Sequence, residues 1–337
     1  MMDILKQSVK EIIPFYGRKE KKGAFQIALT GTDNYIPYIG LAMTSVHHYN
    51  PDMSISFHLF LNALPDIERK RLQEFTELSG DTVYVHLMND DAFQSLIFGE
   101  KTPVFFYRFV VTDLLKDYGD RVLYMDGDIM CRGSLKELVE MDLGNALAAV
   151  VSDRGAKKQM RQIGVSEGFF NAGVMLIHSK LWVQENIFDK VIAMAKDSLT
   201  KIDAKGHYAG WHGLKYNDQN ILNVILDGRR IWLPRKYNYI YQLQRTSVFT
   251  KPHHNDDFKK QILLHFAGNM KPWAEWVQQR PVACEYRKLW LASPWRDIPL
   301  SAPKGKKQFH DAAREYRKRG NYGEWLYWYL KYLRSKV

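Results

Sequence analysis

An alternation of β-prone and helical segments near the N-terminus is the feature that most constrains the fold of this chain. Three strand-like runs, Phe25–Thr30, Ser54–Phe60 and Thr82–Leu87, are separated by helical patterns at Tyr38–Tyr49 and Asp66–Leu78. Strands joined through helices usually pair in parallel, with right-handed crossovers. The sequence therefore predicts an α/β fold with a mixed, mostly parallel sheet flanked by helices.

The segment Arg121–Met130 ends a predicted strand in two closely spaced carboxylates. Its apolar run stops at Asp126, and Gly127 separates that residue from Asp128. Side chains at positions i and i+2 of an extended backbone point to the same side, so both carboxylates can approach one divalent cation. Gly127 allows the backbone to bend, and open α/β sheets bind ligands beyond the carboxyl ends of their strands. A solvated turn is the alternative interpretation of so short a motif.

Further elements are expected downstream. Strands are predicted at Asn145–Val151, Phe169–His178 and Ile262–Phe266, and helices at Phe105–Lys116, Leu181–Leu199 and Asp218–Leu226. The segment Ser293–Pro303 has three prolines in eleven residues, which predicts an extended connector before a helical tail. We therefore expect a polar lead-in over residues 1–22, a main domain over 23–280 and a helical extension over 281–337.

Two other loops carry polar groups suited to a phosphorylated ligand. Thr30 to Tyr35 follows the first predicted strand, where backbone amides and a helix start can meet a nucleotide. An ordinary turn between strand and helix would have a similar composition.

His265 is the third feature of this kind, and it lies in an apolar run near Gly268 and Lys271. A lone histidine in such a run is commonly a core residue. Together with Asp126 and Asp128 it would form an oxygen and nitrogen ligand set with open positions, suited to Mn²⁺ or Mg²⁺ that bridges a diphosphate. Lys271 would then neutralise a phosphate.

The net charge of +11 belongs mainly to the C-terminal segment. Residues 301–337 hold 10 Lys or Arg and 3 Asp or Glu, a net charge of +7, which leaves +4 for the other 300 residues. A general nucleic-acid-binding surface is therefore not expected.

The two cysteines, Cys131 and Cys284, lie far apart in sequence and fit a reducing cytosol rather than a disulfide framework. The sequence shows neither a signal-peptide core nor an apolar run of membrane-spanning length.

Five motifs then occur in a specific order: Asp33–Tyr35, Tyr124–Asp128, Phe169–Val174, Asn217–Asn223 and His265–Trp273. Together they resemble the family 8 glycosyltransferases, retaining enzymes that use nucleotide sugars and have the Rossmann-like GT-A fold. The resemblance covers about residues 25–280, which would make 23–280 a GT-A catalytic domain. The tail motifs Ser293–Asp297 and Leu326–Leu333 further resemble the lipopolysaccharide core hexosyltransferases of Gram-negative bacteria.

The resemblance implies a role for each matching position. Asp126, Asp128 and His265 would hold Mn²⁺ (or Mg²⁺) against the diphosphate of a UDP-sugar. Many family members have an acidic residue where Thr32 stands, so this chain departs from the pattern near the base. The positions expected to contact the nucleotide sugar are Thr30, Thr32, Asn34, Tyr35, Arg108, Asp126, Gly127, Asp128, Asn171, Ala172, Gly173, Asp218, Gln219, His265, Gly268 and Lys271.

Asp218 and Gln219 are the expected catalytic residues beside the transferred sugar. Breaking the anomeric C–O bond leaves a UDP dianion, which the cation and Lys271 would stabilise electrostatically. Retention needs a carboxylate nucleophile or a substitute for it. Because Gln219 is a poor nucleophile, we expect the acceptor hydroxyl to enter on the face that the phosphate leaves.

The tail segment from Tyr322 to Leu333 has helical aromatic spacing, with Trp325, Trp328 and Tyr329 on one arc and basic residues beside it. Such a helix can lie on an anionic membrane surface; docking on the catalytic domain is the alternative.

The expected function is transfer of glucose or galactose from UDP-glucose or UDP-galactose to a lipid-linked lipopolysaccharide outer core. The enzyme would be cytoplasmic, peripheral on the inner membrane, with no nucleic-acid partner. Another glycan or protein acceptor is the first alternative, and a non-catalytic basic membrane-binding protein is the second.

Overall fold

The computed structural model describes residues 2–19, 23–99, 101–243 and 256–335. Its strands are β1 Val9–Phe15, β2 Phe25–Gly31, β3 Ile55–Leu61, β4 Thr82–Met88, β5 Arg121–Asp126, β6 Ile129–Cys131, β7 Ala148–Ser152, β8 Phe170–His178, β9 Arg230–Leu233, β10 Tyr239–Ile240 and β11 Leu263–His265. Its α-helices are α1 Met2–Gln7, α2 Ile36–Tyr49, α3 Asp66–Ser79, α4 Val104–Tyr107, α5 Val111–Leu114, α6 Lys136–Val139, α7 Lys157–Ile163, α8 Ser179–Gln184, α9 Ile187–Leu199, α10 Asp218–Ile225, α11 Asp256–Lys259, α12 Pro281–Leu291, α13 Gly305–Lys318 and α14 Tyr322–Arg334.

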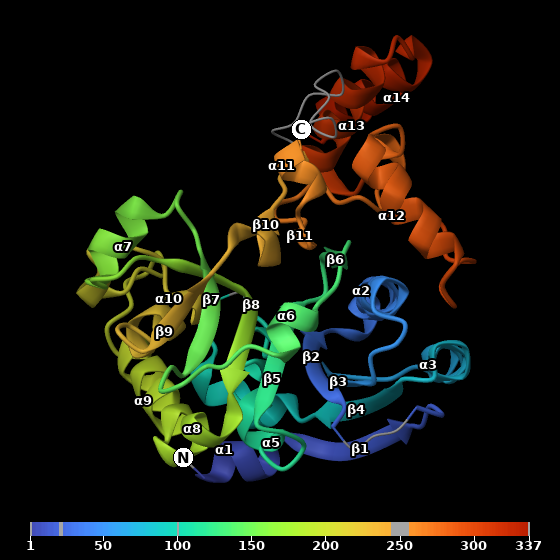
Figure 1. The fold of residues 1–337 in the computed structure, drawn as a ribbon. Helices are drawn as coiled ribbons and strands as arrows, with labels where there is room; N and C mark the ends of the chain where they lie inside the picture. Colours follow the sequence, from blue (N-terminus) through green and yellow to red (C-terminus); the bar gives the residue numbers. More distant parts are fainter. Residues whose placement is uncertain (1, 20–22, 100, 244–255, 336–337) are drawn as a thin grey trace.

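A mixed sheet of eight strands forms the centre of the molecule, in the order β1-β4-β3-β2-β5-β8-β7-β9 (Figure 1). The pairs β2–β3, β3–β4, β2–β5 and β7–β9 are parallel, whereas β1 and β8 run antiparallel to their neighbours. Helices cover both faces. The predicted α/β class with a mostly parallel sheet is confirmed.

Alternating side chains of the strands feed two hydrophobic clusters, one on each face of the sheet. Ile27 and Leu29 of β2 pack with α2, α3 and α12, while Ala28 packs with the cluster under α4, α5, α8, α9 and α10. This follows from the two-residue period of an extended strand. All seven residues of β3 are buried because both faces of that strand are covered.

Three element predictions needed correction. The prediction that the first strand begins at Phe25 was wrong: β1 lies within the lead-in and pairs antiparallel with β4 at the sheet edge. The helix predicted over 105–116 is two short helices, α4 and α5. The helix predicted over 181–199 is interrupted at Asn186, whose φ of +51° separates α8 from α9.

A second, three-stranded sheet in the order β10-β11-β6 lies beyond the carboxyl ends of the central parallel strands (Figure 1). Strand β6 continues the chain directly after the Asp126–Asp128 turn, and β11 pairs antiparallel with it, with His265 opposite Ile129. The small sheet therefore brings His265 to the end of β5, although more than a hundred residues separate them in sequence.

The C-terminal segment packs against helices α2 and α3 and against itself. The connector predicted to be extended over 293–303 forms turns at first, and the Trp295 side chain is fully buried, with its Nε1 donating to Glu68 Oε2 at 2.6 Å. Helices α13 and α14 lie side by side, and a buried ion pair joins Glu315 of α13 to Arg280 at 2.8 Å. None of the described helices is long and apolar enough to cross a membrane.

Candidate metal and nucleotide-sugar site

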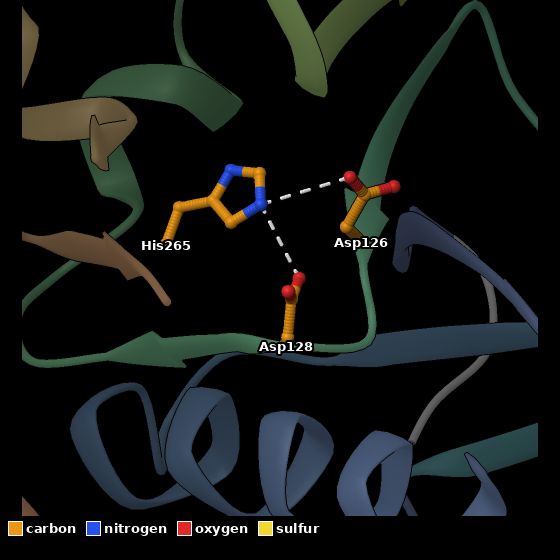
Figure 2. Close-up of side chains that lie close together, drawn as sticks. All are labelled: Asp126, Asp128 and His265. Atoms are coloured by element: carbon orange, nitrogen blue, oxygen red, sulfur yellow. Dashed lines mark ion pairs between the residues drawn. The ribbon is translucent and has the colours of Figure 1, made fainter. Parts of the chain in front are cut away.

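The Asp-Gly-Asp turn after β5 and the histidine of β11 converge on one point (Figure 2). The Nε2 atom of His265 lies 3.3 Å from Asp128 Oδ1 and 3.8 Å from Asp126 Oδ2. One ligand atom from each of the three residues lies within 4.8 Å of the others. Two carboxylate oxygens and an imidazole nitrogen, with further positions open, suit a divalent cation such as Mn²⁺ or Mg²⁺.

Asn238 sets the orientation of the histidine. Its Oδ1 lies 3.0 Å from His265 Nδ1, and because an amide oxygen can only accept, Nδ1 must carry the hydrogen. Nε2 therefore faces the carboxylates as the nitrogen available to a cation, an arrangement typical of histidine ligands. Sequence reasoning missed Asn238, since a single asparagine 27 positions before His265 belongs to no local motif.

Electrostatics at His265 and Asp128 favour the charged forms of both side chains. Burial lowers the pKa of His265, but the carboxylates of Asp128 and Asp126 outweigh it and raise that pKa above its ordinary value. Burial likewise opposes ionisation of Asp128, yet His265 and Lys271 hold its pKa below the usual range. The site therefore stabilises opposite charges, and a cation would replace the proton on His265 Nε2.

Gly173 makes room for this convergence. A Cβ atom at this position would lie 2.4 Å from His265 Cε1 and 2.7 Å from Asp126 Oδ2, both far inside van der Waals contact. At Gly127 a Cβ would lie 2.7 Å from Ile39 Cγ1 and 3.1 Å from Tyr35 Cδ1. Two of the predicted site glycines are thus required by close packing around the carboxylates.

Arg108 connects the end of β5, which carries Asp126, to helix α10, which carries the expected catalytic residue Asp218. Its Nη2 donates to Asp126 Oδ1 at 3.2 Å, its Nε lies 2.9 Å from Asp218 Oδ2, and its Nη1 donates to Ala172 O at 3.2 Å. Both acidic partners are therefore neutralised on one side by a single guanidinium, which fixes α10 relative to β5.

Gln219 is held by the first residues of β8. Its Oε1 accepts hydrogen bonds from Asn171 Nδ2 and from the backbone N–H of Ala172, each 3.1 Å long. The Oδ1 atom of Asn171 in turn accepts from Gly173 N and from Asn238 Nδ2, both at 3.0 Å. A polar network therefore runs from His265 to Gln219 through Asn238 and Asn171.

Lys271 lies in the loop after β11. Its ammonium donates to Asp128 Oδ2 at 2.6 Å and to Phe266 O at 2.7 Å. The loop also contains Gly268, whose φ of +100° favours glycine. Lys271 thus adds a positive charge beside the carboxylates, and its role toward a phosphate stays a prediction.

The predicted nucleoside loop lies beside the same turn. Thr30 Oγ1 is 3.0 Å from the hydroxyl of Tyr124, which donates to Asp126 Oδ1 at 2.9 Å. The Tyr35 ring packs edge-on against Trp273 and close to Gly127. Among the described residues, neither the exposed Asn34 nor the side chain of Thr32 forms a hydrogen bond or ion pair with the carboxylates. The Thr32 carbonyl accepts from Tyr35 N at 2.8 Å.

Two further residues of the site escaped sequence reasoning. Tyr124 belongs to the apolar run of β5, and its hydroxyl donates to Asp126. A residue with a polar hydroxyl near the end of a strand is a signal that could have indicated this role. Lys101 donates to the carbonyl of Tyr216 at 2.6 Å and lies 4.2 Å from the centre of the Tyr216 ring. Burial lowers the pKa of Lys101 to about 8, although Asp218 opposes the shift. No spacing signal links Lys101 to Asp218 in the sequence.

Comparisons with known proteins find relatives that match most of this chain. Lipopolysaccharide glucosyltransferase WaaO of Escherichia coli is 28% identical over 318 residues, which cover 91% of this chain and 90% of that protein. Lipopolysaccharide 1,3-galactosyltransferase of Salmonella typhimurium is 27% identical over 333 residues, covering 96% and 94%. Among solved structures, the galactosyltransferase LgtC in complex with donor and acceptor sugar analogs has the same fold, with a TM-score of 0.64 and 23% identity over 82% of this chain and 98% of LgtC.

Family models cover almost the entire chain. The model described as glycosyl transferase family 8 matches residues 26–277, and the model described as glycosyl transferase family 8 C-terminal matches residues 281–336. The fold, the ordered motifs and the converging Asp126, Asp128 and His265 are consistent with this match. The chain therefore belongs to glycosyl transferase family 8.

Proposed function

We propose that this chain is a retaining hexosyltransferase that transfers glucose or galactose from a UDP-sugar to a hydroxyl of the lipopolysaccharide outer core. The observation that carries the proposal is the convergence of Asp126, Asp128 and His265, with Asn238 directing Nε2 of the histidine toward the carboxylates. The relatives named for lipopolysaccharide glucosyl and galactosyl transfer support the acceptor class and the two donor sugars.

Asp126, Asp128 and His265 are the residues that would hold Mn²⁺, or Mg²⁺ as the second choice. When bound, such a cation stabilises the negative charge that develops on the departing diphosphate. Lys271, 2.6 Å from Asp128, contributes a second positive charge on that side. Arg108 holds Asp126 and Asp218 in fixed positions, so that neither carboxylate has to reorganise during the reaction.

Retention of the configuration at the anomeric carbon is best explained by entry of the acceptor hydroxyl on the same face of the sugar from which the phosphate leaves. Gln219 is an amide, and its oxygen already accepts two hydrogen bonds from β8, which makes it a weak nucleophile. Asp218 is ion-paired with Arg108 at 2.9 Å, which lowers the nucleophilicity of its carboxylate. Both residues then serve to position and polarise the transferred sugar.

A donor assay without acceptor tests the proposal. Incubated with UDP-glucose or UDP-galactose and Mn²⁺, the protein is expected to release UDP slowly, to stop when the metal is chelated, and to resume when Mn²⁺ is returned. Truncated core lipopolysaccharides should accelerate release and gain one hexose. A panel of both donors and several cores identifies the pair used. Mass spectrometry of the stalled enzyme should reveal no hexose on Asp218.

The outcomes separate the alternatives. If no core lipopolysaccharide accelerates UDP release but another glycan or a protein does, that glycan or protein is the acceptor. No metal-dependent UDP release from any UDP-sugar would leave the non-catalytic binding protein as the remaining interpretation. A hexosyl adduct on Asp218 would contradict the proposed stereochemical course while leaving the transferase intact.

The C-terminal extension, residues 281–337, is proposed to attach the catalytic domain, residues 23–280, to the cytoplasmic face of the inner membrane. Trp328 of α14 is buried against Phe309 of α13, so one side of the predicted aromatic arc docks within the protein. The opposite side remains exposed, and two exposed cations accompany it: Arg334 belongs to the same helix, and Arg317 of α13 lies 5.7 Å from the centre of the Trp325 ring. The residues of this apolar face are Tyr322, Leu326, Tyr329, Leu330 and Leu333.

Replacing Leu326 and Leu330 together by glutamate should reduce binding to vesicles of phosphatidylglycerol and phosphatidylethanolamine at least about tenfold. The expectation follows because each leucine contributes roughly 1.5–3 kcal/mol when buried. Both side chains are nearly half exposed, at 48% and 45%, so the folded protein should tolerate the change. Vesicle cosedimentation measures the effect, and Leu78→Glu on α3, an exposed leucine elsewhere, is the control. Equal binding of the double variant and the control variant would refute membrane attachment through α14.

A further inference from the structure

A cavity of about 570 Å³ lies beside the loop that joins β7 to α7, outside the residues assigned to metal and donor. The apolar part of its lining comes from Met160 and Phe169, and its polar part is dominated by cations. The lining residues are Ser152, Asp153, Arg154, Ala156, Lys157, Met160, Arg161, Gly168 and Phe169. The cavity is open to solvent, as a site for a large ligand must be.

A second cavity of about 240 Å³ adjoins this region and reaches Asn238. It shares Ser152, Asp153 and Arg154 with the first and adds Arg235 and Asn238 to its lining. Asn238 is the residue that contacts His265 Nδ1 and donates to Asn171. A ligand extending from the larger cavity across the shared loop would therefore reach the neighbourhood of the transferred sugar.

Positive charge is the distinctive property of these two cavities. Arg154, Lys157, Arg161 and Arg235 contribute four cations against the single carboxylate of Asp153. The Oδ1 atom of Asp153 accepts from Gly155 N at 3.0 Å and so stabilises the loop itself. All four cations are exposed, and none of them forms an ion pair with any described residue.

Unpaired cations beside an apolar wall suit an anionic sugar. The faces of sugar rings pack against apolar side chains, while arginine and lysine bind phosphate or carboxylate through charge-assisted hydrogen bonds. The donor diphosphate does not explain these residues, because its cation ligands lie at the end of β5 and not in the β7–α7 loop.

We propose that Arg154, Lys157, Arg161 and Arg235 form an acceptor subsite that selects glycans with an anionic substituent, phosphate or carboxylate, near the hydroxyl that is glycosylated. The inference rests on the proposed function, since it assigns the charge of the acceptor for the same transfer reaction. It makes the β7–α7 loop and α7, together with Arg235, the specificity-determining elements of the acceptor side.

The test compares three forms of one acceptor, the core oligosaccharide of lipopolysaccharide released by mild acid. One portion is used as isolated, one after removal of phosphate with hydrogen fluoride, and one after reduction of its carboxylates to alcohols. KM for each form is measured with the native protein, with a combined Arg154→Gln, Lys157→Gln and Arg161→Gln variant, and with Lys158→Gln. Lys158 is exposed and adjacent to Lys157 but does not line the cavity, which makes it the matched control.

The native protein and Lys158→Gln should show a KM about tenfold lower for the intact acceptor than for the form that lacks the recognised anion, because several exposed charge contacts to that anion are lost together. A higher KM after dephosphorylation identifies phosphate as the recognised anion, and a higher KM after reduction identifies carboxylate. In the triple variant the three forms should become equivalent. Equal KM for all forms with the native protein, or preserved discrimination in the triple variant, would overturn the proposal.

Donor hydrolysis without acceptor, measured for every variant, reports the donor site separately. If the protein hydrolyses the UDP-sugar but glycosylates no core oligosaccharide, the proposed function fails. The subsite is then tested by calorimetric binding of the intact and treated oligosaccharides. Affinity that depends on the anion in the native protein and vanishes in the triple variant would support the subsite even then, and its absence would refute it.

Discussion

Asp128→Asn is expected to lower glycosyl transfer by about a hundredfold to a thousandfold, a loss comparable to removal of one principal electrostatic group from an active site. Asparagine keeps the size and one oxygen of the side chain but removes its negative charge. Asp128 lies 3.3 Å from His265 Nε2 and 2.6 Å from Lys271, so the substitution leaves two positive groups facing a neutral amide. The affinity of the variant for the cation should fall together with its transfer activity, because a hard divalent ion prefers charged oxygen ligands.

Initial rates at saturating UDP-sugar and Mn²⁺ titrations followed by electron paramagnetic resonance measure the two effects. Asp120→Asn is the matched control. Asp120 precedes the opposite end of the same strand, and its side chain is 62% exposed in an ion pair with Lys180. A variant at position 128 with near-native Mn²⁺ affinity and activity would show that the β5 turn does not hold the cation.

Gly173→Ala is expected to have the second largest effect, a loss of transfer of about a hundredfold, similar to what small displacements of active-site groups cause. The added Cβ would lie 2.4 Å from the ring of His265 and 2.7 Å from Asp126 Oδ2. Since both neighbours belong to the predicted cation ligands, any relaxation that removes the overlap must separate them. The Mn²⁺ affinity should therefore fall with the activity.

Gly323→Ala in α14 is the control for the same chemical change, because the nearest heavy atom to its added Cβ is Asn321 Oδ1 at 3.9 Å. Thermal unfolding of both variants shows whether the overlap at Gly173 also affects stability. Unchanged Mn²⁺ affinity in Gly173→Ala would mean that His265 and Asp126 need not stay together for cation binding.

Local sequence patterns predicted the main sheet well, and they failed where an element has no pattern of its own. Strand β1 was missed because Lys10, Glu11 and Pro14 give it the composition of a polar lead-in. It forms at the sheet edge, where exposed charged residues and a proline are tolerated. The interruption between α8 and α9 was missed because the apolar spacing continues through Asn186, whose backbone conformation alone ends the first helix.

The C-terminal helix illustrates the same division. The spacing of Trp325, Trp328 and Tyr329 predicted an amphipathic helix, and α14 has the expected position. The sequence left open whether that apolar arc faces the protein or a membrane. Packing against Phe309 buries Trp328, whereas Leu326 and Leu330, which widen the arc, remain exposed. One side of the helix therefore docks within the C-terminal extension, and membrane contact of the exposed side stays a prediction.

The sequence by itself determined the alternation of β2, α2, β3, α3 and β4, the paired carboxylates after β5 and the family motifs, because these depend on residues close together in the chain. Tertiary structure decided which distant groups complete the site. Asn238 reaches His265, Arg108 bridges Asp126 and Asp218, and Arg235 joins the cations of the β7–α7 loop and α7 only after the sheet has formed. Hydrogen bonds and ion pairs act over distances of about 3 Å. Which side chains come that close depends on the register of strands that are far apart in sequence, and no local pattern encodes that register.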